Sequence, residues 1–182
     1  LSQLPEVRAR NSARVHPLLK KLKELNPHYA NILVADPDGE VWAAVFRQPA
    51  PFMINDRRYF QNALKTGRLS SGEYVVSKSL TRPVFHFALP FHDQSGRIKG
   101  VIIVALDLNQ YGSILKNSAM PAGTNYLLLD HAGMIITRAV DPEKAVGKRY
   151  PEKALQEMLA GPDEFSYIGP GSQGDQRFIT YR

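Results

Sequence analysis

The sequence ILVADPDGEV at residues 32–41 has a near repeat in YLLLDHAGMI at residues 126–135. Each segment has four mostly apolar residues, then Asp-x-x-Gly, then the start of a second strand-like run. In the first copy Pro37 fixes φ and Gly39 accepts a positive φ, so this chemistry favours a tight turn between two strands. The repeat therefore predicts two β-hairpins of one kind and two units of similar organisation.

Helices and further strands are expected around both hairpins. A short helix is expected to begin near Asn55 or Asp56 and to end at Gly67. The other expected elements are strands at residues 73–78, 84–89, 98–106, 164–168 and 177–181 and helices at residues 108–119 and 152–159. This order predicts an α+β fold in which each unit is an antiparallel sheet flanked by helices, the first unit being the larger.

Before the first hairpin, apolar residues recur at helical spacing, at Val15, Leu18, Leu22 and Leu25. The formal net charge is +6, and much of the excess lies in this N-terminal region. A solvated helix face and a helix close to anionic lipid headgroups both account for that charge. Nucleic-acid binding would need a basic stripe with interleaved aromatic residues or a recognition motif, and neither is found, so we expect no nucleic-acid partner.

Catalytic and metal-binding patterns are also missing from the sequence. It has no cysteine, which excludes disulfides, thiolate metal sites and a cysteine nucleophile. The five histidines do not have the spacing of a metal site. The glycine-rich segment at residues 169–174 is expected between two strands rather than before a helix, which argues against a phosphate-binding loop. We therefore expect no catalytic residue, no metal and no cofactor.

One cluster, DRRYF at residues 56–60, suggests binding chemistry. It places two guanidinium groups and two aromatic rings at the start of a helix, where backbone N–H groups already favour an anion. The alternative interpretation is that Tyr59 and Phe60 anchor the core while Arg57 and Arg58 are solvated or paired with Asp56. The residues alone leave both interpretations open.

Several segments, in their order along the chain, resemble the double Cache family of PAS-like sensor domains. Residues 27–32 with Asp38 and Gly39 resemble its first hairpin, and DRRYFQNA at residues 56–63 resembles its signature Asp-Arg-x-Tyr/Trp-Phe/Tyr-x-x-Ala. The further similar segments are residues 82–84, 100–108, 129–133, 141–143 and 146–147. The resemblance covers nearly the whole chain, and its specificity lies in the ordered set.

The resemblance implies two PAS-like modules in tandem on an N-terminal helical spine. The spine would span residues 1–28 and the membrane-distal module, with the ligand pocket, residues 29–107. A connecting helix at residues 108–122 would lead to a smaller membrane-proximal module at residues 123–182, which we expect to be truncated.

The resemblance also implies where a ligand binds. Arg57 falls where family members that bind amino acids or dicarboxylates have a carboxylate-binding arginine, and Tyr59 falls where they have a pocket aromatic. Arg58 is expected to point elsewhere. Further candidates for the pocket lining are Tyr74, Lys78 and His86, on neighbouring strands.

The chain departs from the amino-acid-binding pattern at two positions. Asn62 and Ala105 stand where amino-acid binders have acidic residues that hold the ligand's ammonium group. Without these carboxylates a buried cation would lack partners, which is costly. We therefore expect a carboxylate without an amine, or another small polar ligand, with Ala105 in the lining of the pocket.

Taken together, these features predict the periplasmic or extracellular sensing domain of a bacterial inner-membrane receptor. A sensor histidine kinase is favoured, and a diguanylate cyclase or chemoreceptor output would have the same sensing region. The domain is expected to be non-catalytic, linked to the membrane by flanking segments, and able to form a weak homodimer. The alternative function is a protein-interaction or signal-transmitting module without a small-molecule ligand.

Overall fold

A computed structural model of the chain describes residues 1, 3–46, 51–77, 80–110, 112, 120–121, 123–170 and 175–182. These residues form two compact units, Leu1–Lys148 and Arg149–Arg182, called here the first and second unit. This division into compact units does not test the module boundaries predicted after residues 28, 107 and 122, which stay predictions.

The described helices are α1 (Pro5–Arg8), α2 (Ser12–Leu25), α3 (Arg58–Thr66), α5 (Pro142–Ala145) and α6 (Glu152–Ala160). The strands of the first unit are β1 (Tyr29–Ala35), β2 (Val41–Ala44), β3 (Ser70–Ser71), β4 (Val75–Ser77), β5 (Arg82–His92), β6 (Ile98–Asp107), β7 (Leu127–Leu129) and β8 (Ile135–Arg138). The second unit has β9 (Phe165–Pro170) and β10 (Gln176–Tyr181). The predicted α+β fold with antiparallel sheets and flanking helices is confirmed.

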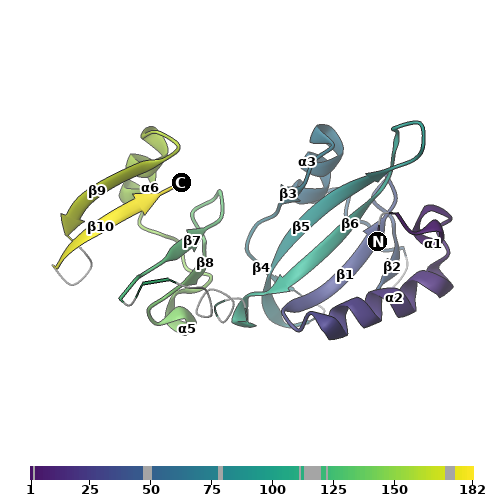
Figure 1. Cartoon of the computed structure of the whole chain (residues 1–182), viewed down its shortest axis with the longest axis horizontal. Coiled ribbons are helices and arrows are strands. Elements are labelled where there is room, and N and C mark those ends of the chain that lie inside the picture. The colour runs from purple at the N-terminus through teal and green to yellow at the C-terminus, as the bar shows by residue number, and fades with distance from the viewer. Residues whose placement is uncertain are drawn as a thin grey trace. The chain divides into compact units, whose positions relative to one another are not determined.

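A six-stranded antiparallel sheet is the centre of the first unit (Figure 1). Its strand order is β2-β1-β6-β5-β3, and β4 pairs with β5 beyond that path. The long strands β5 and β6 pair in register from Val84 with Asp107 to Phe91 with Gly100. This sheet joins strands that are far apart in the sequence, since β1 pairs with β6 along most of its length.

The two faces of this sheet are covered by different helices. On one face α2 packs Val15 and Leu19 against Ile32 and Val34 of β1. On the other face α3 packs its buried residues Tyr59, Phe60 and Ala63 against residues of β1, β5 and β6. Side chains alternate between the faces of a strand, so the near-continuous apolar run of β1 supplies both cores.

Each predicted Asp-x-x-Gly turn is present, and the structure adds a third. Asp36 and Asp130 each use Oδ1 to accept hydrogen bonds from backbone N–H groups two and four residues further on. Asp93, in the connection between β5 and β6, does the same with Ser95 and Arg97. This type of turn therefore recurs along the chain, and its presence does not by itself indicate a repeated unit.

Helix α3 differs from the prediction at its first residue. Its N-cap is Arg57 rather than Asn55 or Asp56, and no side chain caps it. Its end at Gly67 is confirmed, with φ +65° and a bond from Gly67 N–H to the Ala63 carbonyl. The predicted helix at residues 108–119 falls mostly outside the described residues.

The strand predicted at residues 73–78 is present as β4, which begins only at Val75, and residue 78 lies outside the described residues. The structure adds β3 before it, and Gly72–Tyr74 separate the two strands. The N–H of Tyr74 donates to the Asp130 carboxylate at 2.9 Å, which takes this residue out of the ladder with β5. A bond between residues so distant in sequence leaves no trace in the local pattern.

The second unit consists of the β9–β10 hairpin and α6. Its strands pair antiparallel from Phe165 with Tyr181 to Pro170 with Gln176. The predictions of α6, of its end at Gly161 and of these two strands are confirmed within one or two residues.

Candidate functional site

A row of three side chains crosses the α3 face of the large sheet. Asn31 of β1 is in register with Ala105 of β6, and Ala105 is in register with His86 of β5. Residues opposite each other in a ladder point to the same face, with neighbouring strands about 4.8 Å apart. The small Ala105 therefore lies between two larger polar side chains.

Tyr59 of α3 packs against the His86 end of this row. Its ring stacks on the His86 ring with centroids 4.8 Å apart and planes 17° apart. Tyr59 is only 8% exposed and belongs to the core, whereas His86 is half-buried. We call Asn31, Ala105, His86 and Tyr59, together with Arg57, the Tyr59–His86 site.

Gly72 allows this close packing. Its N–H donates to the His86 carbonyl at 2.8 Å. A Cβ atom at this position would lie 2.9 Å from Cδ1 of Tyr59 and 3.4 Å from Cβ of His86. A side chain at residue 72 would therefore push the Tyr59 ring out of the stack.

Arg57 places the positive charge of the site at the N-cap of α3. Its side chain is 52% exposed, and its Nε lies 3.3 Å from Oδ1 of Asp56, which is itself exposed. The pairing of Arg57 with Asp56 agrees with one of the two interpretations left open by the sequence. The core positions of Tyr59 and Phe60 agree with the same interpretation, and the binding role of Arg57 stays a prediction.

Burial keeps the two rings uncharged at neutral pH, and the Arg57 charge adds to this effect only at His86. Burial raises the pKa of Tyr59 to about 12, although Arg57 opposes part of this shift. Burial lowers the pKa of His86 to about 4, and the Arg57 guanidinium lowers it further. The site therefore combines one cation with a neutral phenol and a neutral imidazole, both able to donate a hydrogen bond.

Of the remaining predicted site residues, Tyr74 does not join this group. Tyr74 packs with Phe85, Leu108 and Ile136. Since Phe85 and His86 are consecutive in β5, their side chains point to opposite faces, and Tyr74 lies on the face away from His86. Lys78 lies outside the described residues.

The two positions compared with amino-acid binders are also separated. Asn62 is half-buried on the outer side of α3, in a hollow described below. Ala105 is buried in the sheet with Ala30 and Val84.

Asn31 was not among the residues predicted for the site. This side chain is buried, and its Oδ1 accepts bonds from the N–H groups of Ile32 and Phe46 at 2.9 and 3.1 Å. It thereby fixes the chain where it leaves β2. The signal was available, because Asn31 is a polar residue inside the otherwise apolar strand Tyr29–Ala35.

Among the described residues, no three histidine or acidic side chains are close enough to hold a metal ion. In the same part of the chain, no helix has the length and apolar character needed to span a membrane.

Comparison with solved structures shows the same fold in bacterial receptor domains. The extracellular domain of a protein assigned as a histidine kinase, rpHK1S-Z16, has a TM-score of 0.70 at 19% identity, covering 94% of this chain and 72% of that one. The ligand-binding domain of the Campylobacter jejuni chemoreceptor Tlp3, in complex with L-valine, has a TM-score of 0.61 at 19% identity, covering 97% and 72%. The sensor domain of the V. cholerae histidine kinase DctB has a TM-score of 0.58 at 15% identity, covering 98% and 77%.

No protein of curated function matches the sequence. Residues 1–182, the whole of the chain, match the family described as Cache domain. The chain therefore belongs to the Cache domain family.

Proposed function

We propose that the chain is the extracytoplasmic small-molecule sensing domain of a transmembrane receptor, a sensor histidine kinase, and that the Tyr59–His86 site binds the carboxylate of a small organic acid. The observation that carries this proposal is the buried stack of Tyr59 on His86 beside the Arg57 charge. A burial-stabilised pair of neutral donors next to a guanidinium suits a ligand with one anionic group.

The Arg57–Asp56 pair does not oppose this role. Both side chains are more than half exposed, and such pairs contribute about 0.2–1 kcal/mol. A ligand carboxylate that enters between Arg57 and the rings can replace Asp56 at little cost. Its bond to the guanidinium would then be partly shielded from water, which strengthens the attraction.

The ligand class follows from the charges of the site. Arg57 is the cation, and the position between His86 and Asn31 is the uncharged Ala105. An acid without an amine needs no buried counter-charge there, whereas an α-amino acid would. The Tlp3 relative binds L-valine, so amino acids belong in the test as a contrasting class.

Within this proposal the chain has a distal module at residues 29–107 with the site and a proximal module at residues 123–182, and it has no catalytic activity. Flanking segments would connect it to the membrane, and a weak homodimer would form through α2. Val15, Leu19 and Leu22 pack on the sheet, so the dimer contact would use the exposed side of this helix, where Leu25 is 69% exposed.

The test is a thermal-shift screen of acetate, lactate and L-valine, followed by calorimetry with the acids that stabilise the protein. Arg57→Ala should weaken binding by about 2–5 kcal/mol, because it removes a charge-assisted contact. Arg58→Ala is the matched control, since it removes the neighbouring cation and should cost much less. NMR signals of the His86 ring should shift on binding, which reports on this site alone.

Equal affinities of the wild type and Arg57→Ala, with the fold intact, would show that Arg57 is not a ligand contact. Stabilisation by none of the acids would favour the protein-interaction function.

A further inference from the structure

We propose a second binding site, for a small multiply charged oxyanion, in a hollow on the outer side of α3. The hollow has a volume of about 480 Å³ and lies between α3, β3 and the turn that joins β7 to β8. Its lining residues are Arg58, Asn62, Lys65, Thr66, Arg68, Leu69, Ser70, Ser71 and His131. We call it the outer hollow.

The helix separates the outer hollow from the Tyr59–His86 site. Tyr59, Phe60 and Ala63 are the buried residues of α3. Arg58, Asn62 and Lys65 follow the spacing of one helix face, and they line the outer hollow. The two sites therefore lie on opposite sides of one short helix.

The outer hollow has an unbalanced positive charge. Arg58, Lys65 and Arg68 line it, and none of its lining residues is acidic. In the part of the chain that the structure describes, no carboxylate pairs with these three cations. This sets them apart from the arginines that do form ion pairs with carboxylates, which are Arg10, Arg57, Arg82, Arg97, Arg149, Arg177 and Arg182.

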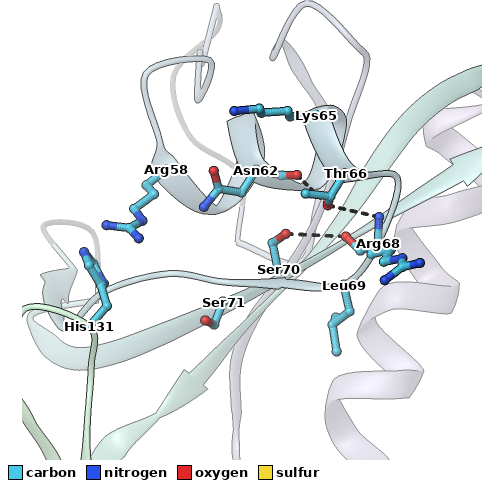
Figure 2. Close-up of a pocket in the computed structure, with 9 residues that line it drawn as sticks. All are labelled: Arg58, Asn62, Lys65, Thr66, Arg68, Leu69, Ser70, Ser71 and His131. Atoms are coloured by element: carbon cyan, nitrogen blue, oxygen red, sulfur yellow. Dashed lines mark hydrogen bonds between the residues drawn. The ribbon is translucent and has the colours of Figure 1, made fainter. Parts of the chain in front are cut away.

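The side chains meet from two directions, as Figure 2 shows. Arg58 extends from α3 toward His131, which extends from the β7–β8 turn, and the Asn62 amide lies beside this opening. His131 Nε2 lies 3.3 Å from Oε1 of Glu73, whose side chain is half exposed. Glu73 holds the ring at the edge of the outer hollow but is not among the residues that line it.

These groups specify the ligand chemistry. Guanidinium and ammonium groups only donate hydrogen bonds, and the amide of Asn62 and the hydroxyls of Ser70 and Ser71 can donate as well. Cations that line one hollow without a counter-charge repel each other, and a bound anion reduces that repulsion. An oxyanion with two or more negative charges, of the phosphate or polycarboxylate type, satisfies both features.

Isothermal titration of the protein with inorganic phosphate and with citrate tests the proposal. The buffer should contain only chloride at low ionic strength, because salt at 0.1 M screens exposed charges beyond about 10 Å. We expect saturable 1:1 binding of at least one probe. The double variant Arg58→Gln/Lys65→Gln should raise the dissociation constant at least about tenfold.

Two control variants make the result specific. Lys20→Gln/Lys21→Gln removes the same charge from exposed positions of α2 and should leave the dissociation constant within about twofold. Arg57→Gln removes the cation of the Tyr59–His86 site and should also leave the dissociation constant of the probe unchanged. The two proposed sites can therefore be tested independently. The His131 ring signals should shift with the probe in NMR.

The absence of saturable binding by both probes would overturn the proposal. So would an equal loss of affinity in the two double variants, because it would show a general effect of net charge. Loss of binding in Arg57→Gln alone would assign the anion to the Tyr59–His86 site instead.

Discussion

Replacing His86 with phenylalanine should remove a specific part of the protein's loss of stability in acid. His86 lies in the large sheet under the Tyr59 ring, and its pKa is lowered to about 4 by burial and by the Arg57 charge. In the unfolded chain a histidine has a pKa near 6.5. The unfolded state therefore takes up a proton at a pH where the folded state does not.

The sign and size follow from these two values. Above pH 6.5 the ring is neutral in both states and has no effect on the pH dependence. As the pH falls from 6.5 toward 4, proton uptake by the unfolded state lowers the free energy of unfolding. At pH 4.5 the loss is about 2.5 kcal/mol, from 1.36 kcal/mol for each pH unit of separation and allowance for partial protonation of the folded state.

Urea denaturation at pH 7.5 and at pH 4.5 measures this loss, with the fluorescence of the single tryptophan, Trp42, as the probe. The wild type should lose about 2.5 kcal/mol more between these pH values than His86→Phe does. The variant keeps an aromatic ring against Tyr59. For each protein only the change in the free energy of unfolding between the two pH values is compared, so a different stability of the variant at pH 7.5 does not affect the result. His92→Phe, at an exposed position at the end of β5, is the control and should behave as the wild type. An equal pH dependence in the wild type and His86→Phe would refute the assignment of His86 as a buried neutral group.

Two further substitutions test the packing of the first unit. Leu19→Ala removes a fully buried side chain between α2 and the sheet, so it should lower the free energy of unfolding by about 2–5 kcal/mol in urea denaturation. Leu25→Ala, at an exposed position of the same helix, is the control and should change this free energy by less than about 0.5 kcal/mol. Asp130→Ala removes the acceptor of three backbone N–H groups, so it should lower the free energy of unfolding by about 2–4 kcal/mol and speed hydrogen exchange at the amide of Tyr74. Asp38→Ala, at an exposed position of the turn at Asp36, is the control and should have little effect on either measurement.

Local chemistry explains the elements that the sequence predicted correctly. Gly67 ends α3 because it adopts a left-handed conformation without steric cost. Asn26 and Pro27 end α2 at Leu25, as the restriction that proline places on the preceding residue leads one to expect. Each of these signals involves residues within one turn of each other, so the sequence around them contains the whole cause.

The candidate site was predictable only in part, for the same reason. Arg57 and Tyr59 share one local motif, and their place at the start of α3 followed from it. The stack of Tyr59 on His86 depends on the register of β5 against β6 and on the space left by Gly72. Neither the register nor that space is encoded near Tyr59 in the chain.

A distant contact also explains why the prediction for Tyr74 was wrong. Period-two alternation placed this residue in a strand beside His86, but pairing with β5 stops at the segment that contains it. The competing partner of its N–H is the carboxylate of Asp130, 56 residues away in sequence. A hydrogen bond to a charged group outweighs one ordinary bond of the ladder, so β4 begins only at Val75, after Tyr74.

In the Asp-x-x-Gly turns at Asp36 and Asp130, one carboxylate makes both a contact that the local sequence predicts and a contact that it does not. In both, Oδ1 closes the turn on backbone N–H groups nearby, which is why the motif predicts the hairpin. The second oxygen bonds to a distant segment in each case. Oδ2 of Asp36 lies 2.9 Å from the Arg10 guanidinium, between α1 and α2, and Oδ2 of Asp130 accepts from Tyr74. One oxygen therefore fixes the local turn and the other fixes what that turn packs against, and only the first of these functions can be inferred from four residues of sequence.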